Sequence, residues 1–117
     1  MQVIHQFEEH VRSHSFPFVD RPLTADEQEI VMASLALAGE AGEVANHVKK
    51  SLRDGIPPVT SDYLLELGAC LHYLVRMVQY AGYSLDEIAS MNITKLTDRL
   101  KNDEAFALKV AKHNTGV

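Results

Sequence analysis

The sequence predicts an all-α fold, a small bundle of four or five helices, and three observations lead to that prediction. Glycine and proline fall into a few clusters, so that the long stretches between them contain no proline. Within those stretches apolar residues recur at helical spacing, and no alternation typical of a strand is evident. Two capping-box patterns mark helix starts, Thr24 with Glu27 and Ser84 with Glu87.

A first short helix is expected over residues 3–14, and a long second helix opens at Thr24, where the capping box satisfies free backbone amides. The second helix is expected to end at Asp54 and Gly55, because the two prolines that follow prevent it from resuming. Its apolar stripe has helical spacing and comprises Ile30, Leu37, Ala41, Val44, Val48 and Leu52.

A third helix is expected to begin at residue 60 or 61 and to reach about Tyr80, with Gly82 closing it. Its core stripe comprises Leu64, Leu67, Leu71, Leu74, Val75 and Val78. The proline-rich turn between the two long helices favours an antiparallel pair. Because two helices in so short a chain enclose their apolar stripes poorly, we expect a homodimer or homotetramer to complete the bundle.

The fourth helix is expected to open at Ser84 and to reach about Leu100. Asp103 then caps a last short helix over residues 104–112, and the tail 113–117 is expected to fray. No internal repeat is present, so residues 1–117 are expected to form a single domain.

Composition excludes several classes of protein. The 117 residues are 46% apolar and 23% charged, as in globular domains, and the net charge of −5 argues against nucleic-acid binding. The single cysteine, Cys70, excludes an intramolecular disulfide and a multi-cysteine metal cage. The N-terminus lacks the pattern of a signal peptide and no 18-residue apolar stretch occurs, so we expect a cytoplasmic protein without a membrane partner.

Both long helices carry a second stripe that is rich in acidic and small residues. On the second helix the stripe comprises Glu29, Ala33, Ala36, Glu40, Glu43 and His47, and on the third it comprises Asp62, Glu66, Ala69, Tyr73, Arg76 and Tyr80. Glu40 and Glu43 are three residues apart, so their Cβ atoms lie roughly 5–6 Å from each other. If the helices pack through their apolar stripes, Glu40, Glu43 and Glu66 converge on one cleft.

Three converging carboxylates repel one another. At ~5 Å and an effective dielectric constant near 20, each pair costs at most about 3 kcal/mol. Protonation of a carboxylate or a bound cation would relieve the repulsion, and ligands that are all oxygen suit Mg²⁺, with Mn²⁺ as a second possibility. Two glutamates at this spacing also occur on solvated helix faces, and the spacing alone leaves that alternative open.

The local sequence around these glutamates resembles the MazG-like nucleoside triphosphate pyrophosphohydrolases. That family carries E-x-x-E, a spacer and E-x-x-D on two packed helices, and here GEAGEVA contains Glu40 and Glu43 and ELGACLHYL begins at Glu66. The segment NITKLTDR, beginning at Asn92, is similar to the family's N-x-x-K-L-x-x-R. The resemblance covers residues 24–100, which leaves an N-terminal segment 1–23 and a C-terminal segment 101–117 outside the core of the MazG-like domain.

The resemblance implies a Mg²⁺-dependent hydrolase of nucleotide metabolism, which converts a nucleoside triphosphate to the monophosphate and pyrophosphate. Glu40, Glu43 and Glu66 correspond to metal ligands and so to catalytic residues. The resemblance also implies substrate-binding candidates that would contact phosphates: Asn92, Lys95, Lys49, Lys50 and Arg53. Tyr73 shares the Glu66 side of the third helix and is a candidate for stacking on a base, although packing in the core or at an oligomer interface is the more common role of such a residue.

One position departs from the family's pattern, because Ala69 stands where the fourth carboxylate is expected. Alanine offers no oxygen ligand, so we expect impaired hydrolysis in this chain. A natural variant with a weakened metal site and a substitution that traps substrate both fit this residue. A non-catalytic module that binds or senses nucleotides is the alternative function, and a purely structural dimerisation bundle is a third. A di-iron oxidase is disfavoured, because neither Glu43 nor Glu66 has a histidine three residues later.

Overall fold

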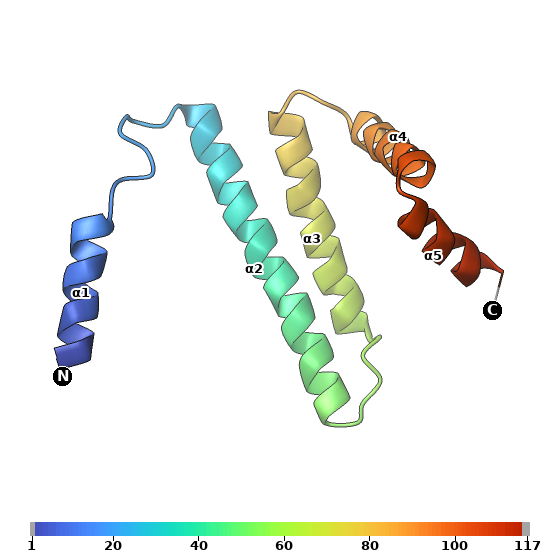
Figure 1. The fold of residues 1–117 in the computed structure, drawn as a ribbon, viewed down its shortest axis with the longest axis horizontal. Helices are drawn as coiled ribbons and strands as arrows, with labels where there is room; N and C mark the ends of the chain where they lie inside the picture. Colours follow the sequence, from blue (N-terminus) through green and yellow to red (C-terminus); the bar gives the residue numbers. More distant parts are fainter. Residues whose placement is uncertain (1, 116–117) are drawn as a thin grey trace.

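Five α-helices in sequence make up the fold of the computed structural model, which describes residues 2–115 (Figure 1). They are α1 (Gln2–His14), α2 (Ala25–Arg53), α3 (Ser61–Tyr80), α4 (Leu85–Asn102) and α5 (Glu104–Asn114). No strand occurs within residues 2–115, so the all-α prediction is confirmed. The expected helix boundaries agree with the structure to within about two residues. Of the tail that was expected to fray, 113 and 114 end α5, whereas 116 and 117 lie outside the described residues.

The helix ends follow from the local sequence. At α2 the hydroxyl of Thr24 accepts from the amide of Glu27 at 3.1 Å, while the Glu27 carboxylate accepts from the amide of Thr24 at 2.9 Å. The same reciprocal pair, between Ser84 and Glu87, begins α4. Gly55 follows α2 with a φ of 68°, a left-handed conformation in which glycine carries no steric penalty. Both predicted capping boxes are therefore confirmed.

The helices α2 and α3 form an antiparallel hairpin that is the only extensive contact between helices in residues 2–115 (Figure 1). Ala33 is 3% exposed and Val78 is also buried, and the Ser34 hydroxyl lies 3.9 Å from the Met77 sulfur. Near the turn, the His47 ring stacks on Tyr63 with the two centroids 5.7 Å apart. The antiparallel pair expected from the proline-rich turn is thus present.

The leucines of α3 do not form the contact with α2, contrary to the predicted core stripe. Leu64 is 57% exposed and Leu71 is 53% exposed, and of the six predicted stripe residues of α3 only Val78 is buried. The side of α3 against α2 instead carries half-buried small, aromatic and polar residues: Tyr63, Glu66, Cys70, Tyr73 and Met77. The exposed residues Leu64, Leu67, Leu71 and Leu74 are called the leucine row below.

The two sides of the hairpin differ in character. At 100° per residue, the leucine row lies on the same side of the hairpin as the apolar stripe of α2. Glu29 and Arg76, whose side chains meet at 3.3 Å, mark the opposite side. Glu43 belongs to this second side, which is called the acidic side below, and Glu40 lies between it and the line that faces α3.

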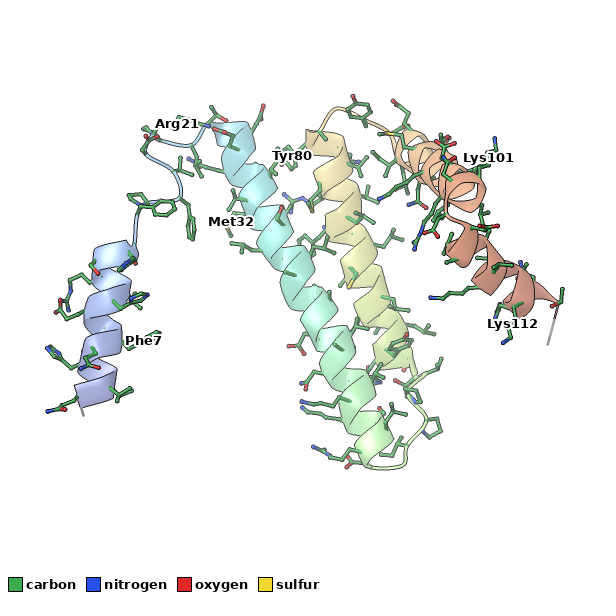
Figure 2. All side chains as sticks on the ribbon, viewed as in Figure 1. Phe7, Arg21, Met32, Tyr80, Lys101 and Lys112 are labelled. Atoms are coloured by element: carbon green, nitrogen blue, oxygen red, sulfur yellow. The ribbon has the colours of Figure 1, made fainter. Side chains whose placement is uncertain are left out.

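The helix α1 stands apart from the hairpin (Figure 1). It lies against no other helix in the part of the chain that the structure describes, and Figure 2 shows the side chain of Phe7 extending from it without a neighbour. The radius of gyration is 20.9 Å, whereas a compact domain of this length has about 13 Å. A single chain therefore does not close into the predicted bundle.

No helix within residues 2–115 is both long and apolar enough to cross a membrane.

Candidate functional site

The α2 half of the candidate site is a short acidic stretch in the middle of the helix. Glu40 is half-buried on the line that faces α3, and Glu43 is exposed nearly one turn later on the acidic side. Gly39 and Gly42 flank these glutamates, and a Cβ built on either glycine would meet nothing within 4 Å. Each glycine in a helix costs about 1 kcal/mol relative to alanine. Because an alanine would fit at both positions, packing within one chain does not explain why glycine is present.

The α3 half of the site contains Glu66, which is half-buried on the side of α3 that faces α2. Its Oε2 atom is buried and has no hydrogen-bond partner. Such an atom loses its hydration without compensation, which typically destabilises a protein by about 1–3 kcal/mol, and by more for a charged group. Ala69 is half-buried nearly one turn further along α3 and brings no polar atom to the site.

The antiparallel register places the two halves at the same level of the hairpin. The contacts of Ser34 with Met77 and of His47 with Tyr63 fix this register. Between them, Glu43 lies close to the level of Glu66, and Glu40 lies nearly one turn earlier on α2, toward the N-terminus of the helix. The register therefore places the three glutamates along one stretch of the hairpin, and the convergence of their carboxylates on one cleft stays a prediction.

The carboxylates are not drawn together into a formed metal site. Across residues 2–115, no group of three or more histidine, cysteine, aspartate or glutamate side chains is arranged to hold a metal ion. The donors that are present nevertheless fit a hard cation, because all three are carboxylates and one of their oxygens is buried and unpartnered. Glu40, Glu43 and Glu66 are the residues that would hold such an ion, whereas Ala69 could not contribute a ligand.

The predicted phosphate-binding residues of α2 lie near its C-terminus. Lys49 and Lys50 are exposed there, two to three turns from Glu40. Arg53 is engaged by Asp54, with hydrogen bonds of 2.9 and 3.1 Å from its Nε and Nη2 atoms. The Asp54 carboxylate holds the pKa of Arg53 above its ordinary value. Arg53 is therefore committed to its neighbour and less suited to a phosphate than the two lysines.

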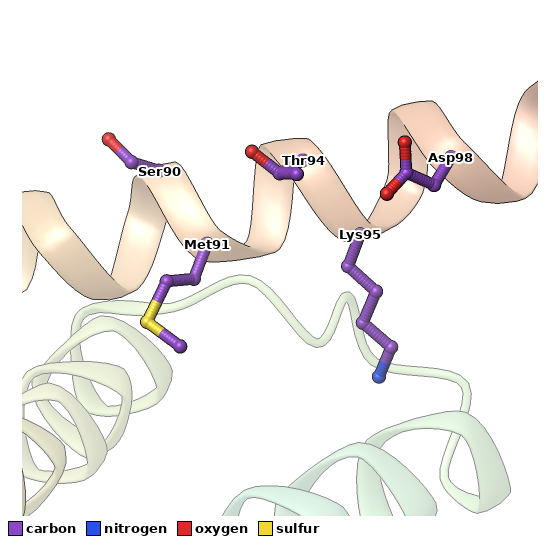
Figure 3. A pocket seen from close by; sticks show the side chains of 5 residues that line it. All are labelled: Ser90, Met91, Thr94, Lys95 and Asp98. Atoms are coloured by element: carbon purple, nitrogen blue, oxygen red, sulfur yellow. The ribbon is translucent and has the colours of Figure 1, made fainter.

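Asn92 and Lys95 lie on α4, which contacts α3 and α5 but not α2 within residues 2–115. The structure thus does not bring them together with Glu40, Glu43 and Glu66. Lys95 lines an open depression on α4 with Ser90, Met91, Thr94 and Asp98, and its side chain extends on the same side of the helix as Met91 (Figure 3).

Tyr73 is half-buried nearly two turns after Glu66, on the side of α3 that faces α2, and its ring meets that of His72 edge-on at 5.1 Å. Arg76 is the residue that the sequence analysis did not single out. It reaches across to Glu29 at 3.3 Å, and its guanidinium lies 6.0 Å from the centre of the Tyr80 ring. Because Arg76 lies on the same helical stripe as Glu66, the sequence could have indicated that it belongs to the site. Arg76 supplies a positive charge close to the acidic side.

Comparison with known proteins gives one weak likeness. The chain is 36% identical over 70 residues to the Gene 37 protein of Mycobacterium phage L5, an alignment that covers 56% of this chain and 61% of the phage protein. No model of a protein family matches the chain, and no solved structure matches it. The comparisons therefore assign neither a family nor an activity.

Proposed function

We propose that this chain is a Mg²⁺-dependent nucleoside triphosphate pyrophosphohydrolase whose own hydrolytic activity is impaired by Ala69. The buried, unpartnered Oε2 of Glu66 carries the proposal, because a charged oxygen in that position lacks a partner that a divalent cation would supply. The sequence resemblance described above supports the same assignment.

The placement of the three glutamates supports a shared ion rather than three separate surface charges. Glu66 comes from α3 and the other two from α2, and all lie within about one turn of the same level of the hairpin. Glu40 is half-buried beside α3, so bulk water screens its charge only in part. This differs from the exposed glutamate pairs that occur on ordinary solvated helices.

In this proposal Glu40, Glu43 and Glu66 hold Mg²⁺. When bound, the ion would neutralise phosphate charge and lower the pKa of a coordinated water. Glu43, the most exposed of the three, is in a position to orient a water that attacks the phosphoanhydride between the α- and β-phosphates. Arg76 adds a positive charge beside the same surface. With Ala69 the chain lacks the side chain that would complete the ligand set.

The alternative is a module that binds or senses nucleotides without hydrolysing them. Ala69 favours it, because a site with three carboxylates could still hold a nucleotide through one cation and yet fail to activate water. In either case we propose that a second copy of the chain completes the bundle, as a homodimer or homotetramer. The exposed leucine row supports this part of the proposal.

The test is an assay of this chain and of its Ala69→Asp and Ala69→Asn variants with Mg²⁺ and each common nucleoside triphosphate. Asparagine matches aspartate in size but lacks its charge, so it controls for filling the position. Pyrophosphate release that only aspartate restores would support the hydrolase. Tight, Mg²⁺-dependent binding by all three without turnover would support the sensing module. No binding by any of them would contradict both functions and leave a structural bundle.

A further inference from the structure

The helix α1 presents an apolar row that nothing in the described chain covers. Ile4, Phe7 and Val11 follow helical spacing, and Phe7 is 63% exposed. The opposite side of the helix carries polar residues such as Gln6. A 13-residue helix is marginal in water by itself, so this helix needs a surface against which to pack.

The linker directs α1 away from its own hairpin. Arg21 makes a two-pronged contact with Glu27, with both distances 2.7 Å, and this contact fixes the chain just before α2. Pro17 and Pro22 restrict the residues that precede them, Phe16 and Arg21, and the segment 15–24 spans up to about 33 Å when extended. The arm, defined as residues 2–24, is therefore long enough to reach a neighbouring molecule.

The chain exposes more surface than a closed monomer does. Its accessible surface is 9844 Å², whereas a compact monomer of 13.0 kDa exposes about 6,300 Å². The excess, about 3,500 Å², exceeds the roughly 800 Å² that each partner buries in an ordinary stable interface. The exposed surface is thus large enough for a stable interface, and a second copy of the chain is a partner that is present wherever the chain is.

The charges on α1 argue against a membrane as the surface that covers its apolar row. The helix carries two glutamates, Glu8 and Glu9, against one arginine, Arg12, so it lacks the cluster of basic residues that draws an amphipathic helix to an anionic membrane. The leucine row is the matching surface, because it presents four exposed leucines along about 15 Å of α3, against about 10 Å for the row on α1. Neither row contains a charged residue.

We propose that two copies of this chain exchange their N-terminal arms, so that Phe7 of each copy packs against the leucine row of the other. This inference does not depend on the nucleotide chemistry proposed above. Each arm then covers the apolar row of α3 that the hairpin leaves exposed, and it buries its own apolar row in the same contact. The exchange is reciprocal, as expected for a symmetric dimer.

The test uses the full chain with Phe7→Glu or Leu71→Lys, which place opposite charges on the two rows. Each variant alone should associate at least about tenfold more weakly than the unmodified chain in sedimentation equilibrium. An equimolar mixture should recover association, since one arm contact is then native and the other pairs Glu with Lys. Circular dichroism verifies that each variant keeps its helices.

The matched controls are Gln6→Glu and His72→Lys, which place the same charges one residue away, off each row. Both should associate like the unmodified chain. The proposal is wrong if the unmodified chain is monomeric, whether or not it binds vesicles of phosphatidylcholine and phosphatidylglycerol. It is also wrong if Phe7→Glu alone leaves association unchanged, or if mixing restores nothing.

Discussion

The Nε2 atom of His47 lies 2.9 Å from the carbonyl oxygen of Pro58, and this contact ties the last turns of α2 to the loop that leads into α3. A carbonyl oxygen only accepts, so Nε2 carries the hydrogen and donates it. The same ring stacks on Tyr63, and it therefore joins the helix, the loop and α3 at one point.

Replacing His47 by phenylalanine should keep the stacking and remove the donor. We expect the His47→Phe variant to lose about 0.5–1.5 kcal/mol of the free energy of unfolding, because the half-buried Pro58 carbonyl loses its partner. Urea unfolding at a fixed protein concentration measures this loss. His72→Phe, at an exposed position of α3, is the control and should behave like the unmodified chain.

Replacing Glu66 by glutamine should separate stability from metal binding. In chelator, Glu66→Gln should raise the free energy of unfolding by about 1 kcal/mol, because it removes an unpartnered buried charge. Mg²⁺ should then raise the melting temperature of the unmodified chain but not that of Glu66→Gln. Glu29→Gln, which lies on the same side of the hairpin and pairs with Arg76, should keep the Mg²⁺ effect. A Mg²⁺ effect that survives Glu66→Gln would contradict the proposed ligand set.

Adding a fourth carboxylate should lower the free energy of unfolding when metal is absent. Ala69→Asp places a second negative charge three residues after Glu66, so in chelator we expect it to be about 0.5–1 kcal/mol less stable than the unmodified chain. Mg²⁺ should recover more stability for Ala69→Asp than for the unmodified chain. Ala69→Asn shares the lower helix propensity of the aspartate variant but adds no charge, so in chelator it should be more stable than Ala69→Asp, and it should gain no additional stability from Mg²⁺. Equal melting temperatures of Ala69→Asp and Ala69→Asn in chelator would count against neighbouring carboxylates.

The capping box of α2 should make the free energy of unfolding depend on pH. The hydrogen bond from Arg21, followed by the one from the Thr24 amide, lowers the pKa of Glu27 from 4.5 to about 2. Because the pKa of Glu27 is lower in the folded state than in the unfolded state, its ionised carboxylate stabilises the fold at any pH above the unfolded-state pKa. This stabilisation is lost as the pH falls toward 2. The Glu27→Gln variant should therefore be less stable than the unmodified chain at pH 7. The difference should shrink between pH 5 and pH 2, as followed by thermal unfolding across that range. A constant difference would show that Arg21 and Glu27 do not form the pair in solution.

Helix boundaries could be predicted from the sequence because they depend on neighbours in the chain. The hydroxyls of Thr24 and Ser84 and the glutamates three residues later are sufficient to start α2 and α4. Gly55 and Gly82, with φ values of 68° and 80°, similarly mark the ends of α2 and α3.

The contact between α2 and α3 could not be predicted in the same way. A helical stripe shows which side avoids water, but it does not show what covers that side. Leu64 and Leu71 form the most apolar row of α3, yet α2 packs against the neighbouring side, where Glu66 lies. The sequence predicted that Lys95 lies on a helix separate from the three glutamates, but it did not show that this helix contacts α3 and α5 rather than α2.

Ala33, the most buried residue of α2, has a consequence for the distant carboxylates. Ala33 brings only a methyl group to the buried side of α2, and Ser51, the other buried residue of this helix, is also small. These two residues lie on either side of Glu40 along the helix, and neither is acidic. We expect a bulkier side chain at either position to push the hairpin apart and so to change the spacing of the carboxylates, while every proposed ligand stays intact.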